Sequence, residues 1–212
     1  MHRAIAFLGV LALAACHGGG GGGAPAADGW AGGGPSIVSM DIENWNFRYG
    51  AGVPQHAQNV PGGGFAFEFP TSGDIDYLTT NVSIAAKDKA HAVIKIEGTA
   101  PTFTASDGCS PAAMHIMLEV RGDDIRQEDG RWWARLNGPP LGVGDYTIDV
   151  SVTDLSQWSN VQGHVATDRP AQFRGAMANL GAVGITFGAC SFGHGVTATG
   201  SPRMTVTEFS VQ

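Results

Sequence analysis

Basic residues and cysteines are both scarce in this chain of 212 residues. It has 12 lysines and arginines against 19 aspartates and glutamates, and three cysteines. Non-specific binding of nucleic acid needs a basic surface, so the acidic balance argues against nucleic acid as a partner. No run of lysine or arginine indicates a site for lipid headgroups either. The acidic charge is compatible with a neutral ligand, a cation, or solubility alone.

Motifs of common enzyme classes are missing as well. The sequence has no Gly-x-Ser-x-Gly elbow, no phosphate-binding loop and no His-Glu-x-x-His. It also lacks the Glu-x-Asp-x-x-Glu strand of retaining hydrolases that resemble laminarinases. Two carboxylates for glycoside hydrolysis can come from distant parts of a chain, with Glu119 and Asp149 as candidates. The sequence nevertheless favours a protein without catalysis, and we assign no catalytic residue.

Metal ligands are spread thinly along the chain. The histidines are His2, His17, His56, His91, His115, His164 and His194, and none of the mature ones has His-x-His or His-x3-His spacing. Zinc is therefore disfavoured. Calcium takes scattered oxygen ligands, which Asp41 and Glu43, or Asp123 and Asp124, could supply. The alternative is that these are solvated acids, and no cofactor is predicted beyond a structural calcium.

A dozen apolar residues, 4–15, follow the short basic start of the chain. This run is too short to span a bilayer as a helix and has the length of a signal-peptide core. Leu13-Ala14-Ala15-Cys16 resembles the lipobox of bacterial lipoproteins, in which the cysteine is acylated and becomes the first mature residue. The alternative is an ordinary secretory signal with an incidental cysteine. The resemblance predicts a signal peptide at 1–15 and a lipid anchor in the membrane at Cys16.

A glycine tract at 18–23, extended by alanine, glycine and proline to residue 35, follows this cysteine. Such a composition gives a flexible coil, so 16–35 is predicted to tether the lipid to a folded domain at 36–212. His17 stands where many inner-membrane lipoproteins have aspartate, which favours the outer membrane of a Gram-negative envelope. Cleavage before Cys16 would leave 11 basic and 19 acidic residues, a formal charge of −8.

The other two cysteines, Cys109 and Cys190, form one potential pair. An oxidising envelope compartment favours a disulfide between them. The bridge would enclose about 80 residues and stabilise the fold by roughly 4 kcal/mol on the chain-entropy model. Two buried free thiols are the alternative.

Short segments of alternating polarity, separated by Gly, Pro, Asn and Asp, run through the domain. They predict an all-β antiparallel sandwich of jelly-roll type with roughly nine or ten strands. The predicted strands are 36–43, 65–69, 77–84, 91–97, 113–120, 145–153, 183–188 and 203–211. The last one changes phase, which a β-bulge near Thr207 or Glu208 would reconcile. Helix is expected only around Phe173 to Leu180, ended by Gly181.

Two adjacent tryptophans occupy a further predicted strand at 130–136, where neighbouring side chains point to opposite faces. One face holds Trp132, Ala134 and Leu136, and the other holds Arg131, Trp133 and Arg135. The first set indicates the core. In the second, Trp133 could stack on a sugar ring while the guanidinium groups donate to hydroxyls. The alternatives are that Trp133 packs beneath a loop, or that a one-residue shift of register exchanges the two tryptophans.

Three more aromatic residues are candidates for the same ligand. Trp45 lies in an irregular stretch, Trp158 lies in a predicted loop, and Tyr77 falls on the polar face of its strand. Loop aromatics at the rim of a sandwich commonly contact ligands. They also commonly close the ends of a core, and both alternatives stay open here.

The second half of the domain, 130–212, resembles jelly-roll carbohydrate-binding modules. The likeness rests on "WWARL", a glycine turn into "DYTIDVSVT", then "VGITFG", and a closing strand that ends in Phe-x-Val. It implies carbohydrate binding without hydrolysis. Such modules often hold a structural calcium near the chain ends, which would make Asp41, Glu43 and Glu208 its ligands.

The sequence thus predicts a lipid-anchored envelope protein with a non-catalytic β-sandwich that binds carbohydrate. A structural or protein-interaction lipoprotein without a small-molecule ligand is the alternative, followed by a glycoside hydrolase.

Overall fold

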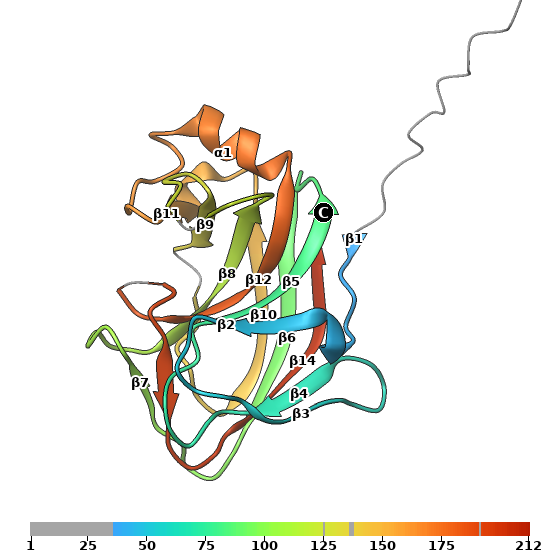
Figure 1. Cartoon of the computed structure of the whole chain (residues 1–212), viewed down its shortest axis with the longest axis vertical. Helices are drawn as coiled ribbons and strands as arrows, with labels where there is room; N and C mark the ends of the chain where they lie inside the picture. The colour runs from blue at the N-terminus through green and yellow to red at the C-terminus, as the bar shows by residue number, and fades with distance from the viewer. Residues whose placement is uncertain (1–35, 125, 136–137, 191) are drawn as a thin grey trace, which may run out of the picture. The chain divides into compact units, whose positions relative to one another are not determined.

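The alternating segments form two facing antiparallel β-sheets (Figure 1). The computed structural model describes residues 36–212 except 125, 136, 137 and 191. Sheet 1 consists, in order across the sheet, of β10 (Gly144–Ser151), β6 (Lys89–Glu97), β14 (Arg203–Val211), β4 (Phe65–Glu68) and β3 (Gln55–Asn59), with β1 (Ser36–Ile37) also paired to β14. Sheet 2 consists of β11 (Trp158–Asn160), β9 (Arg131–Ala134), β8 (Ala113–Val120), β12 (Leu180–Gly188), β5 (Tyr77–Ile84) and β2 (Trp45–Arg48).

A small third sheet pairs β7 (Phe103–Ala105) with β13 (Val196–Ala198). The all-β antiparallel sandwich predicted from the alternation is confirmed. Because of short strands such as these, the described residues form more strands than the nine or ten predicted from the alternation. At the start of the domain, the expected strand 36–43 is limited to Ser36–Ile37, and a 3-10 turn, η1 (Ile42–Asn44), follows it.

The core lies between the two sheets and is built from one face of each. Sheet 1 contributes Phe65, Phe67, Ala92, Ile94, Ile96, Ile148, Val150, Met204 and Val206. Sheet 2 contributes Leu78, Met114, Ile116, Leu118, Trp132, Ala134, Ile185 and Phe187. Every one of these side chains is at most 3% exposed, so their removal from water is the main source of stability. The predicted core positions of Trp132 and Ala134 are confirmed, whereas Leu136 lies outside the described residues.

The last strand has the irregularity that its phase change predicted. Its pairing with β6 shifts register between Val206 and Glu208. The shift lets Val206 and Phe209, which differ in parity, both enter the core with no exposed surface.

The helix is displaced from its predicted range. Helix α1 spans Pro170–Met177 and lies at one end of the sandwich (Figure 1). Proline suits the first turn of a helix because its φ is already fixed near the helical value. Leu180, expected at the helix end, instead begins β12 and pairs with both Val120 and Ile84.

Two tryptophans expected in irregular or loop segments prove to be strand residues of the core. Trp45 begins β2 and is 5% exposed, and Trp158 begins β11 and is fully buried. Each follows a 3-10 turn, η1 or η2 (Leu155–Gln157), whose first N–H groups are capped by Asp41 or Asp154. The turn returns the chain to sheet 2, and the indole of Trp158 packs 5.8 Å from the Phe173 ring.

The predicted signal peptide, Cys16 and the tether precede the described residues. Within the part of the chain that the structure describes, no helix has the length and apolar character needed to cross a membrane.

Candidate ligand-binding site on the outer face of sheet 2

Part of the face of sheet 2 that points away from the core is covered. A row of paired residues crosses β11, β9, β8 and β12 on this face, namely Ser159, Trp133, Met117 and Gly184. Trp133 is 4% exposed and Met117 is fully buried, and with Tyr77 they form a second, smaller apolar cluster. Phe192 packs against that cluster. The loop expected as one explanation for Trp133 is therefore present, in the form of residues 192–195.

A disulfide holds the chain beside this covering turn. Cys109 and Cys190 are bonded, with their Cα atoms 5.7 Å apart, as predicted. Gly193 lies so close to Tyr77 that a side chain at this position would clash with the phenol ring. The ring of Phe192 lies 4.7 Å from the ring of His115. The disulfide and the glycine together allow the turn to lie directly on the sheet.

A cavity of about 280 Å³, here named the Trp133 cavity, remains between this turn and the turn that follows β11. Its lining residues are Tyr77, Trp133, Asn160, Val161, Gln162, Gly163, Cys190, Phe192, Gly193 and His194. The volume lies just below the 300–1,000 Å³ that is usual for small-molecule sites. Two of the aromatic residues proposed from the sequence, Trp133 and Tyr77, thus meet at one cavity. Sequence reasoning missed Gln162 and His194, because only the fold brings their turns together.

Several buried polar atoms on or beside this face have no hydrogen-bond partner among the described residues. They are Asp76 Oδ1, His115 Nε2, Trp133 Nε1, Ser159 Oγ and Thr186 Oγ1. Ser159 pairs with Trp133, and Thr186 pairs with His115, so the atoms are grouped rather than scattered. Leaving such a group unsatisfied costs about 1–3 kcal/mol, and native proteins normally avoid it. A polar ligand or ordered water would supply the missing partners.

Arg131 and Arg135 do not line the cavity. Arg131 is 4% exposed, and its Nε lies 2.6 Å from Asp123 Oδ2 and 3.2 Å from Glu119 Oε2. It also donates a hydrogen bond of 2.9 Å to the hydroxyl of Tyr49. The guanidinium of Arg131 is therefore engaged within the protein, whereas Arg135 is exposed.

Two titratable groups beside the cavity are shifted by their surroundings. Burial, together with the nearby Asp74 carboxylate, raises the pKa of Asp76 to about 6, and His194 acts in the opposite direction. Burial lowers the pKa of His115, whose Nδ1 lies 2.9 Å from the carbonyl oxygen of Ala134. The lowered pKa favours the uncharged imidazole, which suits the contact of His115 with the Phe192 ring.

Two of the three calcium candidates near the chain ends, Asp41 and Glu208, have partners within the protein. Asp41 accepts hydrogen bonds from the backbone N–H of Glu43 and from the side chain of Asn59, and Glu208 lies 3.6 Å from His91. Among the described residues, no three His, Cys, Asp or Glu side chains are arranged to hold a metal ion. A structural calcium stays a prediction.

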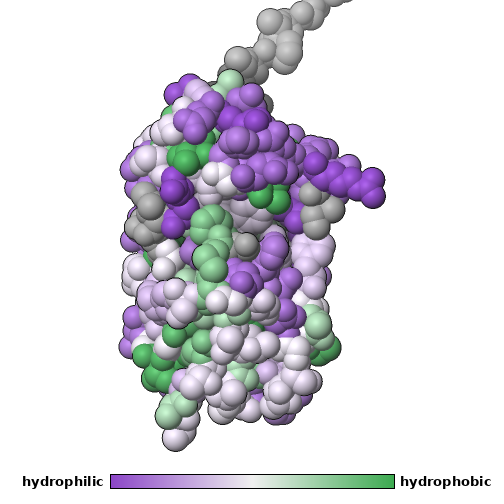
Figure 2. All heavy atoms as spheres, turned by 90° about the vertical axis from the view of Figure 1, so that its left-hand side faces the viewer, coloured by the Kyte–Doolittle hydropathy of each residue, from purple (hydrophilic) through white to green (hydrophobic). Residues whose placement is uncertain are grey.

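Hydrophobic side chains on the side of the molecule shown in Figure 2 form small separate patches among hydrophilic ones. Val161, at the rim of the Trp133 cavity, is 48% exposed. Comparisons with protein-family models, curated proteins and solved structures gave no match. What the site binds must therefore be inferred from its chemistry.

Proposed function

We propose that this chain is a lipid-anchored protein of the bacterial envelope whose β-sandwich binds carbohydrate, without catalysis, at the Trp133 cavity. The observation that carries the proposal is the buried indole N–H of Trp133, which has no partner in the described structure and belongs to a residue that lines the cavity. A sugar hydroxyl could accept the hydrogen bond that this N–H does not make within the protein. The other cavity residues suit the same ligand, because aromatic rings pack on the C–H face of a sugar and amides bond its hydroxyls.

The surroundings of the cavity support a neutral polar ligand. Gln162 and His194 are exposed and present groups that both donate and accept hydrogen bonds. Neither Arg131 on β9 nor Arg135 just after this strand lines the cavity, so the lining offers no guanidinium to a strongly anionic ligand. The resemblance of residues 130–212 to jelly-roll carbohydrate-binding modules favours the same class of ligand.

The membrane anchor is proposed on sequence grounds. Leu13-Ala14-Ala15-Cys16 has the form of a lipobox, and the glycine tract after it has the composition of a tether. His17 supports the outer rather than the inner membrane. The domain would then sample polymers of the envelope while held to the membrane by its lipid.

Affinity electrophoresis against polysaccharides, extended by a glycan array, tests the binding. The protein is used as a soluble form with Cys16→Ser. Trp133→Phe keeps an aromatic ring in the cluster but removes the N–H, and Gln162→Ala removes one amide. Each should weaken retention about 3- to 10-fold, the effect of one lost hydrogen bond. Gln172→Ala, an exposed glutamine on α1, is the matched control and should change nothing.

Failure of the wild-type domain to be retained on any polymer would contradict carbohydrate binding. Release of reducing ends from a retained polymer would show that the protein is a hydrolase and not a non-catalytic binding protein.

A structural or protein-interaction role is the second candidate. It is favoured by the covering turn, because Phe192 already packs on the aromatic cluster and leaves Trp133 4% exposed. On this alternative, the cavity holds only water, and neither Trp133→Phe nor Gln162→Ala alters any binding.

A further inference from the structure

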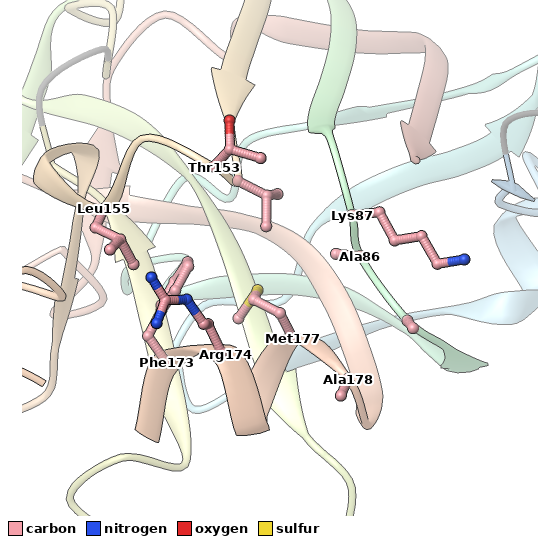
Figure 3. Close-up of a pocket in the computed structure, with 10 residues that line it drawn as sticks. Ala86, Lys87, Thr153, Leu155, Phe173, Arg174, Met177 and Ala178 are labelled. Carbon is pink, nitrogen blue, oxygen red and sulfur yellow. The ribbon is translucent and has the colours of Figure 1, made fainter. Parts of the chain in front are cut away.

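A second cavity, about 510 Å³ in volume and named here the α1 cavity, lies beside the helix (Figure 3). Its lining residues are Ala85, Ala86, Lys87, Val152, Thr153, Leu155, Phe173, Arg174, Met177 and Ala178. It shares no residue with the Trp133 cavity, so its role is independent of carbohydrate binding. The volume is within the usual range for sites that enclose small molecules.

The walls of the α1 cavity are mainly apolar. Phe173 and Met177, one helical turn apart, are 1% and 3% exposed, and both line the cavity (Figure 3). Leu155 from η2 stands on the facing wall. The backbone N–H of Ala86 donates a 2.8 Å hydrogen bond to the carbonyl of Met177, which joins the helix to the end of β5. The walls are thus fixed by the fold.

Small side chains leave the space open. Alanines at positions 85, 86 and 178 line the cavity where larger residues would fill it. Few polar groups are available to a sugar, because Thr153 carries the one uncharged polar side chain of the lining. The cavity therefore suits a hydrocarbon chain rather than a polyol.

One cation marks an edge of this apolar space. Arg174 is exposed, and within the described residues its guanidinium forms no ion pair and no hydrogen bond. Figure 3 places it beside Phe173 and Leu155, whereas the ammonium group of Lys87 points away from the cavity. An anionic head at this edge would form a charge-assisted hydrogen bond with Arg174 while an attached chain lies on the apolar walls.

We propose that the α1 cavity binds a single-chain amphiphile with an anionic head, of the fatty-acid class. The acyl chain lies against Phe173, Met177 and Leu155, and the carboxylate pairs with Arg174. The apolar lining and the adjacent unpaired cation are complementary to the two halves of such a molecule.

Quenching of tryptophan fluorescence by a stearic acid that carries a nitroxide on its chain tests this proposal. Trp132 and Trp158 pack 5.1 Å and 5.8 Å from the ring of Phe173, directly behind the cavity wall. The full mature chain with Cys16→Ser is titrated below the micelle concentration of the probe. Saturable quenching is expected, and unlabelled fatty acid should reverse it. Each methylene removed from the competitor should weaken its binding by up to about fourfold.

Variants test the contacts of the acyl chain and those of the anionic head separately. Ala178→Phe, at an exposed position, should fill the cavity and weaken binding at least tenfold, and Ala85→Phe serves as a second filling variant if the first does not fold. Arg174→Glu should weaken fatty-acid binding at least tenfold but leave a fatty alcohol of equal length unaffected. Arg135→Glu, an exposed arginine outside the cavity, is the charge-matched control and should bind normally.

Three results would overturn the proposal. The first is quenching that does not saturate, and the second is quenching that folded Ala178→Phe and Ala85→Phe leave unchanged. The third is concentration-dependent dimerisation in size-exclusion chromatography that Ala178→Phe abolishes, which would assign the cavity to a second copy of the chain.

Discussion

Arg131 on β9 and Glu119 on β8 face each other across the outer side of sheet 2, with Arg131 Nε 3.2 Å from Glu119 Oε2. The same nitrogen lies 2.6 Å from Asp123 Oδ2, and Arg48 adds a second guanidinium 3.2 Å from Glu119. The side chains of Arg131, Glu119 and Asp123 are at most 9% exposed. A buried charge network therefore adjoins Trp133, and its charges depend on one another.

Removal of Arg131 should destabilise the domain strongly. Arg131→Ala leaves the carboxylate of Asp123 buried without its cation and leaves Glu119 with Arg48 alone. Breaking a buried pair in this way costs about 3–5 kcal/mol in the free energy of unfolding. Urea denaturation monitored by tryptophan fluorescence measures the change. Lys95→Ala breaks the pair with Glu97, in which both side chains are about half exposed, and should cost much less because solvent screens the two charges. Equal losses in the two variants would show that the network is not effectively buried.

Loss of the disulfide should weaken both the fold and the Trp133 cavity. The bridge joins residues 81 positions apart, so Cys109→Ser with Cys190→Ser should lower the free energy of unfolding by about 2–5 kcal/mol. Because Cys190 lines the cavity, the double variant should also bind carbohydrate less tightly at a temperature where it remains folded. Unfolding curves with and without reductant make the first measurement. Reactive thiols in the unreduced, Cys16→Ser protein would contradict the bridge.

The core residues could be predicted because a strand that is buried on one face places an apolar side chain at every second position. In β10 and β8 the inward residues follow that repeat without interruption, from Ile148 to Val150 and from Met114 to Leu118. The outer face of sheet 2 could not be predicted in the same way. His115 and Met117 point outward as the alternation requires, yet they are buried under a turn that lies more than 70 residues further along the chain. No local pattern specifies that contact.

The strand positions of Trp45 and Trp158 had a signal in the sequence, but a search for alternating polarity does not detect it. Asp41 and Asp154 each stand four residues before a tryptophan, with Ile or Leu directly after the aspartate. Each aspartate accepts the N–H two residues on and so caps a single 3-10 turn. The polar residues between Asp and Trp therefore form a turn that re-enters the sheet. Their polarity alone made the segments look like loops.

Acylation at Cys16 can be tested in cells by metabolic labelling with an alkyne analogue of palmitate. The lipobox predicts that the chain is labelled and that Cys16→Ser abolishes the label. Cys190→Ser, which removes a different cysteine, should leave the labelling intact. Label that persists in Cys16→Ser would refute the assignment of the anchor to this residue.

Asp76 should make the domain less stable as the pH rises from about 4 to about 6. Burial, with the repulsion of Asp74, raises the pKa of Asp76 from 3.8 to about 6, so the folded protein holds a proton that the unfolded chain has already lost. Below pH 3.8 both states are protonated and Asp76 has no effect. Above pH 6 both are ionised and the whole penalty is present, roughly 1 kcal/mol once partial solvent exposure is allowed for.

Asp76→Asn removes this titration. Its free energy of unfolding, measured against wild type by urea denaturation, should improve by that amount between pH 4 and pH 7. The comparison with wild type also cancels the opposing contribution of His115, whose lowered pKa reduces stability as the pH falls below 6.5. Asp149→Asn is the control of opposite sign, because hydrogen bonds with His91 and Lys89 hold the pKa of Asp149 below its usual value. A flat difference between Asp76→Asn and wild type across this range would mean that Asp76 is ionised in the folded protein at pH 4, with water or a cation beside its buried oxygen.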